Sequence, residues 1–183
     1  MRIVFIEIQN FRGIKLLEWA PGSAVNCLIG SGDSTKTTIL DALELAFNPR
    51  SYPFADDSDF YNLDFDNPIK ITITIGDLPA EFLSDDRYGM YLRGWDPIRS
   101  KIEDESRDEL EDVLSLRVTI DKSLEARWSI FNERIDADEN DPPWLRYAAT
   151  AVVVRRVAAV SRPTIHPTNS PYIDAAPASR SAA

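Results

Sequence analysis

The chain has few of the residue types typical of secreted or membrane proteins. Its 183 residues include one cysteine and one histidine. The single cysteine, Cys27, excludes an intrachain disulfide and fits a reducing cytosol. With only His166 as a conceivable base, we expect Cys27 to be a buried small side chain rather than a nucleophile. No signal peptide and no apolar run of ~18 residues is present, so we expect a cytoplasmic protein without membrane contact.

Basic residues are also scarce, with 20 Lys and Arg against 30 Asp and Glu and a net charge of −10. This balance argues against a broad DNA-binding surface, because affinity for the phosphate backbone comes mainly from Lys and Arg. Clustered carboxylates at Asp56, Asp57 and Asp59 and in residues 103–112 would suit Mg²⁺ or Mn²⁺. Solvated loop and helix faces are far commoner, and we favour that interpretation, with Asp59 capping a turn.

One segment carries most of the chemical information, because residues 30–37 nearly match the phosphate-binding loop G-x-x-x-x-G-K-[ST]. Gly30, Lys36 and Thr37 are in register with this motif, whereas Thr35 replaces the glycine that precedes the lysine. In such a loop, backbone N–H groups surround the phosphates, the lysine contacts their outer oxygens and the hydroxyl binds Mg²⁺. An ordinary Gly/Ser/Asp turn before a helix is the alternative.

The flanking patterns favour the loop. Residues 24–29 are apolar and β-branched, which predicts a buried strand, and residues 38–47 have helical periodicity. The predicted apolar face of that helix contains Ile39, Leu40, Leu43 and Phe47. A helix that starts at the loop adds its partial positive charge to that of the lysine.

Thr35 weakens the prediction of nucleotide binding. If the loop needs a left-handed backbone there, a β-branched residue raises its conformational energy by about 1–2 kcal/mol, which glycine avoids. The side chain would also crowd the phosphates.

Alternating apolar residues predict further strands. The pattern in residues 69–75 places isoleucines on one face and Lys70, Thr72 and Thr74 on the other, so we expect an antiparallel strand with one buried face. Residues 78–83 suggest a short helix, and residues 90–95 a strand or turn. The remaining predicted strands are 2–9, 15–19, 114–120 and 126–131, with the last two forming a hairpin.

The sequence resembles the N-terminal lobe of the ABC-type ATPase heads in SMC, RecF and OLD (overcoming lysogenisation defect) proteins. The resemblance rests on "IEIQNFRGIK", on "NCLIGSGDSTKTTILDALELAF" and on residues 55–61. It looks closest to the bacterial OLD-like AAA-family ATPases and ATP-dependent endonucleases, which are linked to DNA repair and phage defence. The implied fold is α/β, the N-terminal half of a P-loop NTPase head with a mixed sheet and antiparallel β hairpins.

The resemblance also implies ligands and binding residues. ATP and Mg²⁺ are the expected cofactors, with Lys36 on the β- and γ-phosphates and Thr37 on the metal. Arg12 is either the basic residue that related heads place near the nucleotide or a solvated turn arginine. The implied binding residues are Arg12, Gly30, Ser31, Gly32, Asp33, Ser34, Thr35, Lys36, Thr37 and Thr38.

Two hypotheses about function follow. No apolar run ending in paired acids follows the helix, and the signature motif and Toprim nuclease domain of the family are missing, so we expect little ATPase activity from this chain alone. The chain is then an ATP-binding lobe that needs a homodimer or a missing head half in trans, with DNA contacted only through a larger assembly. Alternatively, it is a non-catalytic remnant or interaction fragment with a degenerate loop.

The composition changes near Asp141. Residues 143–183 contain five arginines, no lysine and a single acid, Asp174. The prolines in residues 161–183 follow no hydrophobic period, which favours disorder. We therefore assign residues 1–141 to the partial head and 142–183 to a tail, which is either the product of a frameshift or a basic segment that grips nucleic acid.

Overall fold

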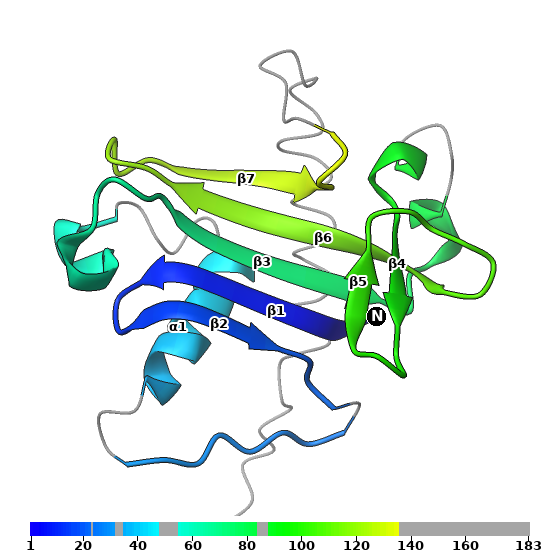
Figure 1. Cartoon of the computed structure of the whole chain (residues 1–183), viewed down its shortest axis with the longest axis horizontal. Coiled ribbons are helices and arrows are strands. Elements are labelled where there is room, and N and C mark those ends of the chain that lie inside the picture. The colour runs from blue at the N-terminus through cyan, green and yellow to red at the C-terminus, as the bar shows by residue number, and fades with distance from the viewer. Residues whose placement is uncertain (23, 32–34, 48–54, 84–87, 136–183) are drawn as a thin grey trace, which may run out of the picture.

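An antiparallel β-sheet with one helix packed against it makes up most of the described structure (Figure 1). The computed structural model describes residues 1–22, 24–31, 35–47, 55–83 and 88–135. The strands are β1 (Arg2–Phe11), β2 (Ile14–Trp19), β3 (Ile69–Gly76), β4 (Arg93–Asp96), β5 (Lys101–Glu103), β6 (Glu111–Ile120) and β7 (Ala126–Phe131). The helix is α1 (Lys36–Phe47), and 3₁₀ turns lie at η1 (Asp57–Asp59), η2 (Tyr61–Leu63), η3 (Ala80–Phe82) and η4 (Gly89–Tyr91).

The strand order is β2-β1-β3-β6-β4-β5, and β7 also pairs with β6. The long strand β6 has two neighbours along one edge, because Val113 pairs with Arg93 of β4 while Ser115 pairs with Phe131 of β7. All pairings among the described strands are antiparallel. The α/β prediction is thus confirmed for the described residues, but the expectation of a mixed sheet is wrong for them.

Most elements expected from alternation are present, with small differences at their ends. The strands predicted at 2–9, 15–19, 69–75, 114–120 and 126–131 are β1, β2, β3, β6 and β7. The short helix expected at 78–83 is the 3₁₀ turn η3, and residues 90–95 divide between η4 and β4. The predicted boundary near residue 141 and the tail lie outside the described residues.

The main core forms where α1 packs against β1, β3 and β6, and Figure 1 shows the helix on one side of the sheet. Isoleucines 69, 71, 73 and 75 of β3 point to this side and are fully buried. On the helix, Ala42 and Ala46 are fully buried, and their small side chains let the backbone approach the sheet. Fully burying one isoleucine stabilises the fold by about 1.5–3 kcal/mol, so this layer supplies much of the stability.

The buried face of α1 differs from the predicted one. Ile39 is buried as expected, and Leu43 and Phe47 are partly buried against the core, but Leu40 is 57% exposed. The fully buried face is completed by Ala42, Leu45 and Ala46. Leu40 was predicted to be buried because it is hydrophobic. The alanines are buried instead because their small side chains allow the helix to pack closely against the sheet. Leu40 therefore presents an apolar side chain on the side of α1 away from the sheet.

The second face of β3 is also buried, which contradicts the prediction of a single buried face. Thr72 and Thr74 are inaccessible because polar side chains of the neighbouring strands cover them. Arg117 donates from Nε to Thr72 Oγ1 at 2.8 Å, and Thr74 Oγ1 lies 2.8 Å from Ser115 Oγ. These hydrogen bonds allow hydroxyl groups to be buried without the cost of an unsatisfied polar atom.

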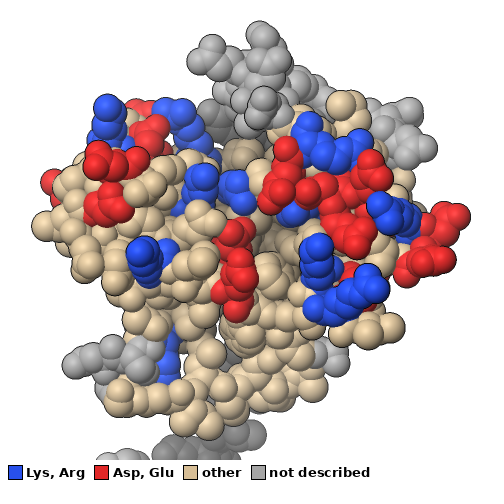
Figure 2. Space-filling model, in the orientation of Figure 1, with Lys and Arg blue, Asp and Glu red and all other residues tan. Residues whose placement is uncertain are grey.

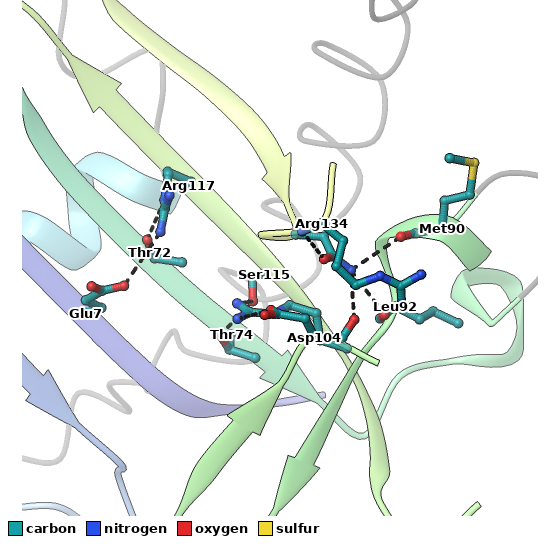
Figure 3. A network of polar contacts seen from close by, with 11 residues as sticks. Glu7, Thr72, Thr74, Met90, Leu92, Asp104, Ser115, Arg117 and Arg134 are labelled. Atoms are coloured by element: carbon teal, nitrogen blue, oxygen red, sulfur yellow. Dashed lines mark hydrogen bonds and ion pairs between the residues drawn. The ribbon is translucent and has the colours of Figure 1, made fainter. Parts of the chain in front are cut away.

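Arg117 contacts side chains of the neighbouring strands on this second face (Figure 3). Its Nη2 lies 3.6 Å from Glu7, and its guanidinium carbon lies 3.2 Å from the centre of the Phe131 ring. Burial lowers the pKa of Arg117, and the Glu7 carboxylate opposes that shift. Nearby, the buried Arg93 of β4 lies 2.6 Å from Asp104, and its Nη1 donates to Ser115 Oγ of β6 at 3.1 Å.

The predicted buried strand at residues 24–29 is absent, and this is the largest correction. The segment is extended away from the sheet below α1 in Figure 1, with Val25 92% and Ile29 93% exposed. Cys27, expected in the core, is exposed. None of the described strands pairs with this segment. A strand without a partner leaves its N–H and C=O groups to water.

Candidate functional site

The loop predicted to bind phosphate leads directly into α1, which begins at Lys36. The Thr35 carbonyl accepts the first helical hydrogen bond, from the Ile39 N–H at 3.1 Å. The first N–H groups of an α-helix have no acceptor within the helix, and its dipole gives this end a partial positive charge. The junction therefore has the local geometry of an anion-binding helix start.

Thr35 adopts the left-handed conformation that the sequence argument considered, with φ of 60°. This conformation is the one for which the loop motif normally supplies glycine, and it is strained for a β-branched side chain. The Thr35 methyl group packs against the β1–β2 turn, where a Cβ added to Gly13 would lie 2.9 Å from Thr35 Cγ2. Thr35, at the position where the loop motif has glycine, therefore faces a glycine of the β1–β2 turn, Gly13.

Lys36 reaches back over its own loop. Its Nζ donates to the carbonyl oxygen of Gly30 at 3.0 Å and also to that of Ser31. The ammonium group and the helix start therefore place positive charge on the same loop. Thr37 is exposed and Thr38 is half-buried in the first turn. Gly32, Asp33 and Ser34 lie outside the described residues.

Arg12 is held at the turn between β1 and β2, where its φ is 48°. Its Nε donates to Asp59 Oδ1 at 2.7 Å, its Nη1 donates to Asp41 of α1, and its backbone N–H donates to the Asp59 carbonyl at 2.7 Å. The side chain is 33% exposed. Arg12 is thus a half-exposed turn arginine whose guanidinium joins the β1–β2 turn to η1 and α1.

Asp59 is more than a solvated member of an acidic cluster, since it is only 4% exposed. Its Oδ2 accepts the Asp56 N–H at 3.0 Å, and Asp56 caps η1 in return by accepting the Ser58 N–H at 2.8 Å. That backbone hydrogen bond lowers the pKa of Asp56. The sequence argument expected Asp59 to cap a turn, but it did not anticipate the ion pair with Arg12.

Asp41 is the member of this site that sequence reasoning missed. It lies four residues after Thr37, so the two side chains share one face of α1. The four-residue spacing from Thr37 could have identified Asp41 in the sequence. However, an aspartate inside an amphipathic helix usually indicates only a solvated position.

The acidic run at residues 103–112 is exposed at 105–109 and half-buried on either side, and it contains one arginine, Arg107. Arg107 lies 3.6 Å from Glu103 and 3.8 Å from Glu105. Figure 2 shows acidic and basic side chains mixed over the region of β4 and β5 rather than one continuous basic surface on the described part of this face. Within the described residues, no group of three His, Cys, Asp or Glu side chains is arranged to hold a metal ion.

A separate hollow of about 580 Å³ lies beside the turn end of the β1–β2 hairpin. Lys15, Lys70 and Tyr61 contribute to its lining, and none of the loop residues 30–38 does. The Asn10 side chain borders it and donates to the carbonyls of Asp64 at 2.9 Å and Asn67 at 2.6 Å. No sequence motif pointed to this hollow.

In the part of the chain that the structure describes, no helix is long and apolar enough to cross a membrane.

The chain is similar to known proteins. The family model of the AAA ATPase domain matches residues 1–142. The DNA replication and repair protein RecF of Nitrosococcus oceani is 40% identical over 52 residues, which cover 28% of this chain and 14% of that protein. The chain is thus matched to a small part of its curated relative.

A solved structure from a study of ATP-driven dimerization and DNA-stimulated activation of SMC ATPases is also similar, with a TM-score of 0.44 and 13% identity. The match covers 82% of this chain and 79% of the other. The family match spans most of the sequence and includes the β1–β2 turn, the loop and α1. The chain therefore belongs to the AAA ATPase domain family.

Proposed function

We propose that residues 30–38 bind ATP together with Mg²⁺, and that this chain serves as the nucleotide-binding lobe of a RecF-, SMC- or OLD-like ATPase. The observation that carries the proposal is the start of α1 at Lys36, with the lysine ammonium folded over the carbonyls of Gly30 and Ser31. A phosphate entering the loop replaces weak carbonyl acceptors with a full negative charge. Charge-assisted hydrogen bonds of this kind are about twice as strong as neutral ones.

Each residue has a distinct role in this proposal. Lys36 neutralises the outer phosphate oxygens, the backbone N–H groups of the loop and first turn surround the phosphates, and the exposed Thr37 hydroxyl binds Mg²⁺. An oxygen donor suits this hard cation. Arg12 adds a second positive charge from the β1–β2 turn, which contacts the loop through Gly13.

The chain is proposed to act within a larger assembly, as a homodimer or with a second head half supplied in trans. The exposed apolar side chains of Val25, Ile29 and Leu40 support this, because large apolar side chains left uncovered are candidates for contact with a partner. The similarity to RecF, a DNA replication and repair protein, supports a role in DNA processing. The net charge of −10 suggests that other parts of the assembly contact DNA.

A second candidate function is an interaction fragment that no longer binds nucleotide. The strained backbone of Thr35 favours it, because the loop has a β-branched side chain at a left-handed position. Both candidates retain the same fold and differ in whether the loop accepts phosphate.

Thermal melting with and without millimolar Mg·ATP separates the two candidates. Ligand at a hundred times its dissociation constant adds about 2.7 kcal/mol of stability, which raises Tm by roughly 5–10 °C for a chain of this size. We expect that shift in the native chain and in the matched control Lys101→Ala, and its loss in Lys36→Ala. A shift that appears only in Thr35→Gly would establish the second candidate. Absence of a shift in every variant would refute nucleotide binding.

A further inference from the structure

We propose that the two carboxylates on Arg12 have opposite effects on nucleotide binding: Asp59 positions the guanidinium, and Asp41 competes with phosphate for it. The inference rests on the proposed binding of ATP at residues 30–38. It assigns Asp59 as a positioning residue and Asp41 as an exchangeable partner of Arg12.

Asp59 holds Arg12 through contacts that a ligand would not displace. One carboxylate oxygen accepts the Arg12 Nε at 2.7 Å, and the other accepts the Asp56 N–H at 3.0 Å. The backbones are joined as well, by the hydrogen bond from Arg12 to the Asp59 carbonyl and by a bridge between Phe11 and Phe60. The Asp59 side chain is 6% exposed, so little water screens the pair. Nε therefore stays fixed and sets the direction of the guanidinium.

Asp41 contacts the outer end of the Arg12 side chain, at a position that is more exposed to water than Asp59. It pairs with Nη1, and its side chain is 36% exposed. Ion pairs that water reaches in this way are worth only about 0–1 kcal/mol, so a stronger anion can replace this partner. Because Asp41 lies one helical turn after Thr37, the exchange would take place beside the expected Mg²⁺ ligand.

The charges of these three side chains explain why exchange is needed. Arg12 carries one positive charge, and the two carboxylates that it contacts carry two negative charges. The three side chains together carry a net charge of −1, which opposes the approach of a phosphate. Separation of Arg12 Nη1 from Asp41 removes the nearest competing acceptor and leaves the guanidinium oriented by Asp59.

A purely structural cross-link makes a different prediction. If Arg12 serves only to join α1 to η1, loss of either carboxylate loosens the site, and both substitutions lower stability and nucleotide affinity together. The exchange model requires changes in affinity of opposite sign, which a general loss of stability cannot produce.

The test measures Mg·ATP affinity by calorimetry on the full chain and its variants, with apo melting curves for each. We expect Asp41→Asn to bind about three- to fivefold more tightly, from the size of an exposed ion pair. Asp59→Asn should bind about tenfold more weakly, from the size of a charge-assisted hydrogen bond. If Asp59→Asn fails to fold, Arg12→Lys replaces it, because lysine keeps the charge but has no Nε for Asp59 to hold.

Two controls separate exchange from a general effect of charge. Glu44→Gln removes the same charge from an exposed position on α1 and should leave the affinity unchanged. In an Arg12→Ala background, Asp41→Asn should no longer tighten binding, because the competition is lost with the arginine.

Binding that is lost in Lys36→Ala but is unchanged or weaker in Asp41→Asn would overturn the exchange model and leave the proposed function standing. Tightening that persists without Arg12 would overturn it as well. If neither the native chain nor Thr35→Gly binds Mg·ATP at millimolar concentration, the proposed function fails and the exchange model fails with it.

Discussion

Replacement of Thr35 should stabilise the protein even in the absence of nucleotide. The residue has φ of 60°, in the left-handed region where a Cβ approaches the following carbonyl oxygen. Glycine has no Cβ and adopts this conformation without strain. Most substitutions destabilise a folded protein, so a gain in stability at a predicted binding site is an unusual expectation.

The magnitude follows from two opposing terms. Relief of the left-handed strain contributes about 1–2 kcal/mol. The greater freedom of glycine in the unfolded chain removes about 0.4–1 kcal/mol of that gain. The net stabilisation of Thr35→Gly is then about 1 kcal/mol, or about 2–4 °C in Tm for a chain of this length. Thr35→Ala keeps its Cβ and should gain less, because it retains most of the strain.

Differential scanning calorimetry of the two variants tests this order. The facing turn supplies a second check, because a Cβ at Gly13 would lie 2.9 Å from Thr35 Cγ2. We expect Gly13→Ala to lower Tm in the native chain and to be better tolerated together with Thr35→Gly. If Thr35→Gly melts below the native protein while Thr35→Ala melts above it, packing of the side chain rather than backbone strain controls this position, and the reasoning is wrong.

Other predictions concern the second face of the sheet and acid stability. Thr74→Val removes a fully buried hydroxyl that pairs with Ser115 and should cost about 1 kcal/mol in chemical denaturation; a neutral result would contradict the assigned hydrogen bond. Arg117→Ala leaves a half-buried carboxylate unpaired and should cost about 3 kcal/mol, whereas the exposed Arg127→Ala should cost under about 1 kcal/mol; equal losses would refute this account of the network. A hydrogen bond from a neighbouring asparagine lowers the pKa of Asp64, so its contribution is present above the unfolded pKa of about 3.9 and is lost as pH falls through the lower folded value. Tm measured between pH 6 and 2 should therefore fall below about pH 4, and less steeply in Asp64→Asn.

The sheet could be predicted from the sequence because its signal is local. In β3, isoleucine at every second position marks the face toward α1 whichever strands lie beside it. The same pattern could not show that Thr72 and Thr74 are buried. Their burial depends on Arg117 and Ser115, which are more than forty positions away in the chain. Alternation predicts which residues share a face but does not predict what covers the polar face.

The candidate site was partly predictable for the same reason. The loop motif placed Lys36 at the junction with the helix, which starts two residues before the predicted residue 38, and it identified Thr35 as the strained position. The partners of Arg12 could not be deduced, because Asp41 and Asp59 come from segments that only the folded chain brings together. Neither carboxylate belongs to a motif, and each resembles an ordinary surface aspartate in the sequence.

The wrong prediction of a buried strand at residues 24–29 and the exposure of Leu40 have one physical explanation. An apolar β-branched run predicts burial, but burial as a strand needs a partner, and none of the described strands pairs with this segment. Val25 and Ile29, which precede the loop in the chain, and Leu40, which follows it, are all exposed. The sequence pattern predicts that these side chains are buried, whereas the structure leaves them exposed. A further layer of protein packed against them would account for both observations. Because these side chains flank the proposed nucleotide loop in the chain, we expect a partner that covers them to alter phosphate binding as well.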